Sequence, residues 1–297
     1  MNFQEHREII NKLKRQLTTP PSYDMLSVLL SELQYTMEDN PELSVADRDF
    51  VITYSGYIKK WATTMYVETM EQQWDDLYWR TMLFEAPYLF ESYLIYMEKD
   101  RNPEKRFYLP RRKSLKVVVD DLQDLEDGKL DFYGLSMPSR VGKSTVCIFY
   151  LSWIAGKRPN SHSAMGGHSG KLAKGFYGEL LNLINTREYK FSEIFPDSPL
   201  QKTSAEDFEI NLDEPDRFAT ITCRGIDGTW TGAVDVSSDG YLYVDDLIRD
   251  REHSLNPVRM ENTYQEYLNK MVDRKNDGAR ELMVGTRWNI IDPLGKI

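Results

Sequence analysis

The stretch Ser136-Met137-Pro138-Ser139-Arg140-Val141-Gly142-Lys143-Ser144-Thr145 decides how the second half of this 297-residue chain folds. An apolar run, 132–135, precedes it, and a second apolar run, 146–151, follows it. Apolar segments on both sides of a Pro- and Gly-containing turn predict a short strand, a loop and a helix that opens at Lys143.

Glycine, lysine and a hydroxyl residue at a helix start are typical of a phosphate-binding P-loop. Such a loop turns its backbone N–H groups inward, and the helix N-terminus adds the positive end of its dipole. Lys143 is then expected to reach the outer phosphates, and the Ser144 hydroxyl to bind Mg²⁺. The general pattern G-x-x-x-x-G-K-[ST] asks for glycine at position 137, where this chain has Met.

The composition indicates a globular protein with a sizeable core, because 41% of the residues are hydrophobic and 28% are charged. No apolar run reaches the length of a membrane span, and the N-terminus has no apolar signal region. Cys147 and Cys223 lie far apart in apolar stretches, which favours two buried thiols in a reducing compartment over a disulfide. The net charge of −10 argues against nucleic-acid binding over the whole surface.

Residues 1–98 are expected to form helices, in four amphipathic runs. The runs cover about 9–17, 23–37, 46–71 and 74–97. Proline ends the first two runs, Ser44 is expected to cap the third, and Pro87 to interrupt or start a helix within the fourth. The aromatic residues of these runs have helical spacing, which favours a helix-bundle core over a base-stacking surface.

From residue 99 the pattern changes, and we place a domain boundary between 98 and 99. Seven basic and two acidic residues lie between Lys99 and Lys113, and residues 106–112 are expected to be extended because Pro110 restricts its predecessor. Ser114 is expected to cap a helix over 115–127. Strands are then predicted at about 132–137, 162–166, 218–224, 241–244 and 282–286, and helices at about 143–155, 170–184 and 257–272. This alternation predicts an α/β domain with a mostly parallel sheet and flanking helices.

Two further strand ends carry polar residues. The apolar run 241–244 ends in Asp245 and Asp246, a pattern that in P-loop ATPases binds the hydrated Mg²⁺ and polarises the attacking water. A strand that ends in a turn with two solvated aspartates is the alternative. Thr286 ends the last predicted strand, where a polar side chain can sense a γ-phosphate, although an ordinary strand-to-loop turn explains it as well.

As a set, these motifs resemble the N-terminal ATPase domain of the terminase large subunits of tailed phages, the motors that package DNA. That family, of the ASCE class of P-loop NTPases with a RecA-like fold, has an arginine in a P-loop that lacks the first glycine. It also has a Walker B strand ending in two acids and a coupling motif. The matching segments here are 138–144, 244–247 and 285–294. Residues 167–173 also resemble the family's Tyr-Ser-x-x-Leu-Ala segment, with His168 where tyrosine is usual.

The resemblance implies an Mg²⁺-dependent ATPase and a role for each matched residue. Lys143 and Arg140 would contact the γ-phosphate, Ser144 and Asp245 would hold Mg²⁺, Asp246 would orient the water, and Thr286 would couple hydrolysis to motion. Asp246 is one methylene shorter than the glutamate usual in the family. The expected nucleotide-binding set is completed by Pro138, Ser139, Val141, Gly142 and Thr145, with Tyr108 or Arg111 stacking on adenine. A solvated linker or a DNA-facing patch is the alternative for that basic segment.

The chain departs from the family in two respects. The family has a Thr-Gly-Arg-Gly stretch, whose arginine is a candidate for reaching into the active site of a neighbouring subunit. This chain has Thr231-Gly232-Ala233 at that place, without the arginine. Arg224 is the nearest arginine and a weak candidate for the same role. The nuclease domain that follows in the family is not expected in this sequence. The resemblance otherwise implies double-stranded DNA, a ring of copies on the capsid portal, the portal protein and the small terminase subunit as partners, in the host cytoplasm and without a membrane.

Two other functions are compatible with the motifs. A helicase-like translocase shares both Walker motifs but requires a second RecA-like domain. A nucleotide-binding assembly module, inactive without its partner subunits, requires no turnover by this chain alone, because a missing trans arginine lowers the rate by about 10³-fold or more.

Overall fold

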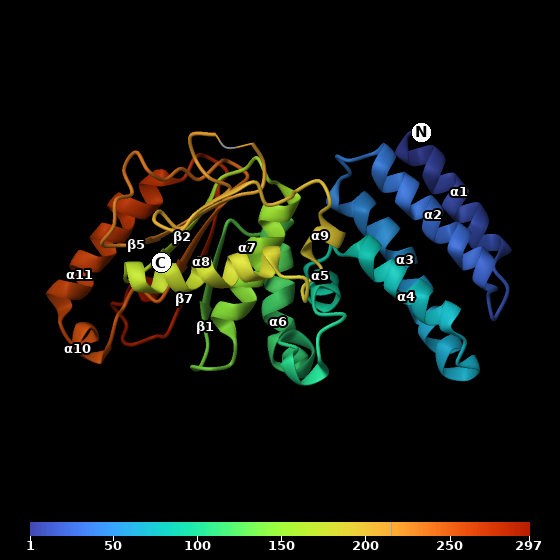
Figure 1. Cartoon of the computed structure of the whole chain (residues 1–297), viewed down its shortest axis with the longest axis horizontal. Helices are drawn as coiled ribbons and strands as arrows, with labels where there is room; N and C mark the ends of the chain where they lie inside the picture. The colour runs from blue at the N-terminus through green and yellow to red at the C-terminus, as the bar shows by residue number, and fades with distance from the viewer. Residues whose placement is uncertain (215) are drawn as a thin grey trace. The chain divides into compact units, whose positions relative to one another are not determined.

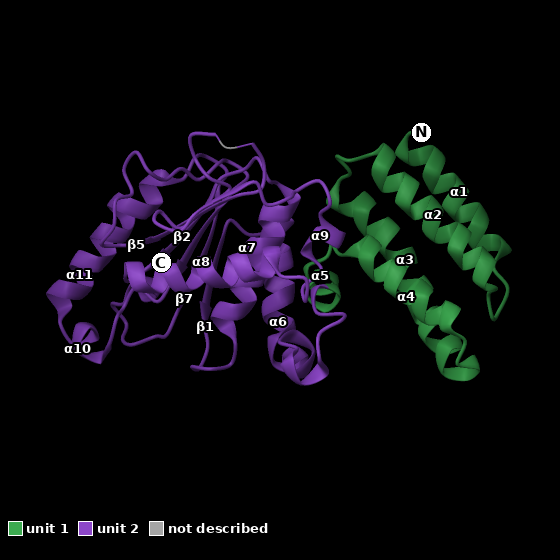
Figure 2. Cartoon of the chain, in the orientation of Figure 1, with its two compact units in different colours: residues 1–96 green, residues 97–297 purple. Residues whose placement is uncertain are grey.

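The computed structural model describes residues 1–214 and 216–297. They divide into two compact units, residues 1–96 and residues 97–297 (Figure 2). The boundary placed from the sequence lies two residues further along the chain. The first unit is helical and the second contains a sheet flanked by helices (Figure 1).

The helical N-terminal region is confirmed. Its helices are α1 (Phe3–Gln16), α2 (Tyr23–Asp39), α3 (Val45–Thr69), α4 (Gln72–Glu85) and α5 (Phe90–Met97). The Ser44 side chain accepts a hydrogen bond from the Asp47 backbone N–H and so caps α3, as the sequence predicts. Pro87 lies between α4 and α5, where no helical hydrogen bond is lost.

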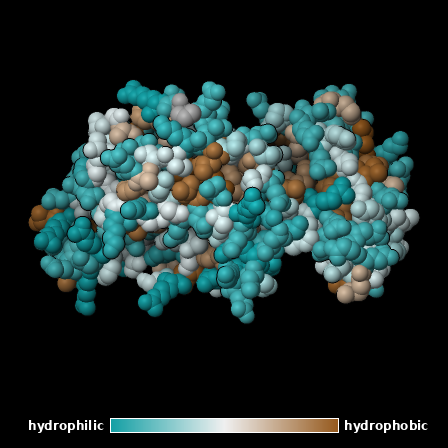
Figure 3. Space-filling model, in the orientation of Figure 1, coloured by the Kyte–Doolittle hydropathy of each residue, from teal (hydrophilic) through white to brown (hydrophobic). Residues whose placement is uncertain are grey.

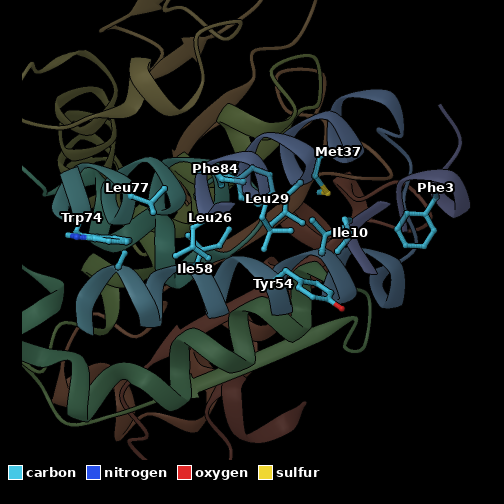
Figure 4. Packing of buried hydrophobic residues seen from close by; sticks show 14 residues of the cluster. Phe3, Ile10, Leu26, Leu29, Met37, Tyr54, Ile58, Trp74, Leu77 and Phe84 are labelled. Atoms are coloured by element: carbon cyan, nitrogen blue, oxygen red, sulfur yellow. The ribbon is translucent and has the colours of Figure 1, made fainter. Parts of the chain in front are cut away.

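A hydrophobic core joins the first four helices of this unit. Leu26 and Leu29 of α2, Ile58 of α3 and Leu77 of α4 have no exposed surface, and Figure 4 shows these side chains converging between the helices. Tyr54 and Trp74 are buried in the same core. The interpretation of the aromatic positions as helix-bundle core is therefore confirmed.

The second unit has a mostly parallel sheet, and the α/β class is confirmed. Its strands are β1 (Phe132–Ser136), β2 (Ser163–Gly167), β3 (Lys202–Ser204), β4 (Glu209–Asn211), β5 (Ile221–Gly225), β6 (Tyr241–Asp245) and β7 (Arg280–Gly285). Their order is β1-β7-β6-β2-β5-β4-β3, and the first five are parallel to one another. The short antiparallel strands β3 and β4 at one edge were not predicted.

Helices cover both faces of this sheet (Figure 1). On one face lie α6 (Tyr108–Glu126), α7 (Lys143–Lys157) and α8 (Gly170–Asn185), and the ring of Tyr243 on β6 contacts Phe176 of α8. On the other face, Leu242 and Val244 pack with residues of a π-helical turn, Tyr267–Met271, that continues α11 (Pro257–Glu266). The short helices are α9 (Phe191–Ile194), α10 (Arg251–Ser254) and α12 (Pro293–Lys296).

The extended segment expected over 106–112 is wrong, because α6 already begins at Tyr108. The buried carboxylate of Glu98 accepts hydrogen bonds from the backbone N–H groups of Phe107, at 2.8 Å, and Tyr108, at 3.0 Å. A carboxylate is favourable at a helix N-terminus, where the first N–H groups have no helical partner. Pro110 falls in the first turn, where its missing N–H costs no hydrogen bond.

The face of the molecule drawn in Figure 3 is largely hydrophilic. In the view of Figure 3, hydrophobic residues form small separate groups between hydrophilic ones.

Unit 1–96 carries 15 Asp and Glu residues against eight Lys and Arg residues, a net charge of −7. Within the described ranges, the helices include none with the length and apolar character that a bilayer crossing requires.

A cluster of ion pairs around the buried Glu126 ties α6 and α7 to the amino ends of the central strands. Glu126 accepts hydrogen bonds from Lys157 at 2.6 Å, from Arg158 at 2.8 and 2.9 Å and from the Tyr241 hydroxyl at 2.8 Å, and Arg280 lies 3.7 Å away. Burial favours the neutral acid, but Lys157 and Arg158 outweigh it and hold the pKa of Glu126 well below its ordinary value.

We predict that Glu126→Gln lowers the free energy of unfolding by about 2 kcal/mol at pH 7, because it leaves the half-buried cations Lys157 and Arg158 without their carboxylate. A carboxylate with a lowered pKa stabilises the fold above its unfolded pKa of about 4.3 and loses this effect on acidification. The difference between wild type and variant should therefore shrink below about pH 4, as urea denaturation at several pH values will measure. Glu206→Gln, at an exposed position, is the control, and equal stability of wild type and Glu126→Gln at pH 7 would contradict the prediction.

Candidate functional site

The loop 137–142 connects β1 to α7 and has a backbone conformation that requires glycine at its end. Gly142 has φ 98° and is the residue directly before α7. A Cβ atom there would also lie 2.7 Å from a ring carbon of Phe107. Arg140 has φ 68°, an uncommon conformation for a residue with a side chain. The loop is therefore tightly turned just before the helix N-terminus.

Lys143 and Thr286, 143 positions apart in the sequence, meet at this loop. The buried Lys143 ammonium donates hydrogen bonds to the Thr286 hydroxyl at 2.8 Å and to the Met137 carbonyl at 3.3 Å. The contact follows from the strand order, since β7 pairs directly with β1 and Gly285 lies opposite Ser136. The two predicted residues thus follow the carboxyl ends of neighbouring parallel strands.

Asp245 is the last residue of β6 and is almost fully buried, with 1% of its surface exposed. The Tyr243 hydroxyl donates a hydrogen bond of 2.5 Å to its Oδ2 atom. Oδ1 is buried and accepts no hydrogen bond from any residue that the structure describes. Burial raises the pKa of Asp245 to about 6, against the opposing effect of the Tyr243 and Ser144 hydroxyls. A buried, unsatisfied carboxylate oxygen near a serine hydroxyl fits a hard divalent cation such as Mg²⁺.

Asp246 is held in a left-handed conformation, with φ 44°. Its backbone N–H donates to the Val284 carbonyl at 2.9 Å, and its own carbonyl accepts a hydrogen bond from Nδ1 of His168 at 2.9 Å. Its Oδ1 atom accepts a hydrogen bond from the Thr286 backbone N–H at 3.3 Å. Thr286 therefore contacts both residues: its backbone N–H donates to Asp246, and its hydroxyl accepts from Lys143.

The other residues expected in the loop are more open to solvent. Pro138, Ser139 and Arg140 are exposed, whereas Val141, Ser144 and Thr145 are half-buried. Arg140 makes no ion pair with the residues that the structure describes. Its guanidinium is thus available to a ligand held by the loop.

Of the two residues expected to stack on adenine, Tyr108 is buried and Arg111 is exposed. The Tyr108 ring has no exposed surface, so it is not available to a base. Arg111 is exposed, and its guanidinium lies 5.3 Å from the centre of the Phe107 ring. Phe107 itself contacts the loop at Gly142 and stacks on Phe149 with ring centres 5.7 Å apart. Phe107 is not among the residues predicted from the sequence, because an extended segment over 106–112 does not bring its ring to the loop.

Arg224, the weak candidate for a trans-acting finger, has partners within its own chain. Its guanidinium lies 3.2 Å from the Glu209 carboxylate and 3.7 Å from that of Asp207. It stands on β5, which is separated from β1 by β7, β6 and β2. The described contacts are those of a residue that holds β4 and β5 together.

Two residues of the site had no assigned role in the sequence analysis. Tyr243 was only part of an apolar strand, although a position two residues before Asp245 lies on the same face of that strand. His168 was noted only for standing where the terminase motif has tyrosine. Its contact with Asp246 depends on the pairing of β2 with β6, which places Gly167 opposite Asp245.

We predict that Asp245→Asn changes how stability depends on pH in the absence of divalent cations. A carboxyl group with a pKa raised to about 6 binds more protons in the folded state, so the free energy of unfolding falls as pH rises from about 4 to 6. The variant lacks this ionisation and should be more stable than wild type by about 2 kcal/mol at pH 7.5. Urea denaturation between pH 4 and 7.5 measures the effect, with Asp131→Asn as an exposed control. Identical pH profiles for wild type and Asp245→Asn would refute it.

Comparison with known proteins assigns no family to this chain. No protein-family model matches it, and no curated protein matches it. The support for a function therefore comes from the sequence motifs and from the side-chain geometry of the described residues.

Proposed function

We propose that this chain is an Mg²⁺-dependent ATPase of the P-loop, RecA-like class and the motor domain of a terminase large subunit. The observation that carries the proposal is the hydrogen bond of 2.8 Å between the Lys143 ammonium and the Thr286 hydroxyl, with Asp245 and Asp246 on the adjacent strand. Four residues that three separate motifs single out meet at the carboxyl ends of β1, β7 and β6. Ligands of α/β proteins bind at this edge of the sheet.

The loop supplies the phosphate site. The N-terminus of α7 directs free N–H groups and the positive end of its dipole toward the loop. The Lys143 ammonium exchanges its contacts with Thr286 and Met137 for oxygens of the β- and γ-phosphates. The exposed Arg140 adds a second cation at the γ-phosphate, and both charges stabilise the transferring phosphoryl group.

Ser144 and Asp245 are the residues that would hold Mg²⁺, through the serine hydroxyl and the unsatisfied Oδ1 atom. The bound ion would neutralise charge that develops on the phosphate oxygens. Tyr243 occupies Oδ2, so Oδ1 is the oxygen of this carboxylate that would hold the ion. A bound metal ion would favour the ionised carboxylate and so offset the cost of burying it.

Asp246 orients the water that attacks the γ-phosphate, and Thr286 couples hydrolysis to motion. The segment after Thr286 is organised by Asp292, whose carboxylate accepts hydrogen bonds from the Trp288 N–H at 2.8 Å and the Gly295 N–H at 2.8 Å. The Asn289 side chain then donates to the Ser254 carbonyl at 2.7 Å. A displacement of Thr286 can therefore reach α10 and the segment beside it.

The resemblance to terminases supports translocation of double-stranded DNA as the task that this hydrolysis drives. It also supports a ring of copies at the capsid portal, with the portal protein and the small terminase subunit as partners. The alternatives are a helicase-like translocase and a nucleotide-binding assembly module without turnover of its own. Measurements of ATP binding and hydrolysis distinguish the module from the two motors.

We predict that Lys143→Ala and Asp246→Asn each lower ATP hydrolysis by about 10²-fold or more, since each removes a group that acts on the transferring phosphate. Lys60→Ala, at an exposed position of α3, should leave it unchanged. Hydrolysis is to be measured against protein concentration, with and without double-stranded DNA. A packaging motor predicts a rate that rises faster than linearly with protein and increases with DNA.

Each contrary result bears on a different part of the proposal. Normal ATP binding by Lys143→Ala would refute the phosphate site. Full activity of Asp246→Asn would refute only the role of that residue in activating water. ATP binding without hydrolysis in the wild type, under every condition, would favour the assembly module.

A further inference from the structure

His168 connects the end of β2 to the end of β6. It follows Gly167, the last residue of β2, and precedes Ser169, the N-cap of α8. Its Nδ1 atom lies 2.9 Å from the backbone carbonyl oxygen of Asp246. A carbonyl oxygen only accepts hydrogen bonds, so Nδ1 must carry the hydrogen atom in this contact.

Asp246, which accepts this hydrogen bond, has a left-handed backbone conformation with φ 44°. A left-handed conformation at a residue other than glycine costs of the order of 1 kcal/mol and persists only where surrounding contacts maintain it. The described contacts of Asp246 come from two directions. Val284 and Thr286 hold its N–H and its carboxylate from the β7 side, and His168 holds its carbonyl from the β2 side.

Open space surrounds part of the His168 imidazole. His168 is half-buried and lines a cavity of about 330 Å³ together with Leu247 and Arg249. A second cavity, of about 270 Å³, opens between His168 and the first turns of α8. A substitution at this position therefore leaves the hydrophobic core intact, and its effect reports on the hydrogen bond.

We propose that His168 is a positioning residue, whose Nδ1–H holds the Asp246 backbone in the left-handed conformation that directs its carboxylate toward Thr286 and the γ-phosphate. This role rests on the proposed ATPase function. It does not require contact between His168 and the nucleotide. Loss of the donor lets the Asp246 peptide rotate, and a shift of about 1 Å in a catalytic group is enough to reduce a rate by up to about 10²-fold.

The test compares two substitutions at this position in the full chain. His168→Leu removes the donor, and His168→Asn retains one, because the asparagine side-chain amide can take the place of Nδ1–H. For His168→Leu we expect kcat to fall by about 10-fold or more with little change in KM for ATP, since the phosphate contacts of Lys143 remain. For His168→Asn we expect most of the wild-type kcat to return.

A measurement that is independent of activity tests the hydrogen bond itself. NMR of the protein labelled with ¹⁵N-histidine distinguishes the two neutral tautomers, and His168 should be protonated at Nδ1. The Nε2–H tautomer would overturn the proposal, as would a His168→Asn variant that is as slow as His168→Leu.

The result for Lys143→Ala separates this proposal from the ATPase assignment. Wild-type kcat in His168→Leu, together with loss of activity in Lys143→Ala, would overturn the role of His168 and leave the ATPase function standing. Absence of Lys143-dependent hydrolysis in the wild-type protein would overturn both.

Discussion

The pairing of β7 between β1 and β6 is the constraint on which the candidate site depends. In a parallel sheet, equivalent ends of neighbouring strands lie at one edge, and the residues that follow them are brought together whatever their separation in the sequence. Lys143 comes after β1, Asp246 after β6 and Thr286 after β7. Since β7 pairs with β1, which precedes it by more than 140 residues, the site forms only when these distant segments of the second unit have come together. The helices on the two faces of the sheet support this edge without contributing its chemistry, apart from the first turn of α7.

Much of this arrangement follows from the sequence. The apolar runs before Ser136 and Asp245 predict strands, and the helix that opens at Lys143 follows from Gly-Lys-Ser. In these segments local propensity and tertiary packing agree. The end of α6 was predicted within a residue for the same reason, because Gly128, with φ 71°, stops the helix as glycine does in this conformation.

The features that were not predicted depend on contacts between residues that are far apart in the sequence or on strands too short to show a pattern. The start of α6 is set by Glu98, a carboxylate ten positions before Tyr108 that is buried only in the folded unit. Strands of three residues, such as β3 and β4, carry too few positions to show an alternation. Phe107 belongs to the site because it contacts Gly142, and His168 because it contacts Asp246; each contact joins two different elements. No local sequence pattern predicts such contacts between elements. Lys143 and Asp245, in contrast, belong to sequence motifs that can be recognised without the structure.

The left-handed backbone at Asp246 bears on the identity of that residue. In the terminase motif that this segment resembles, glutamate is usual at the corresponding position, and this chain has the shorter acid. Aspartate is one of the few residues with a side chain that tolerates the left-handed region, and glutamate is not. The identity of the acid and the unusual backbone therefore go together: the turn after β6 admits a short carboxylate and disfavours a long one. A glutamate at position 246 would therefore require a change in the backbone around it, so the choice of acid and the shape of the loop are coupled.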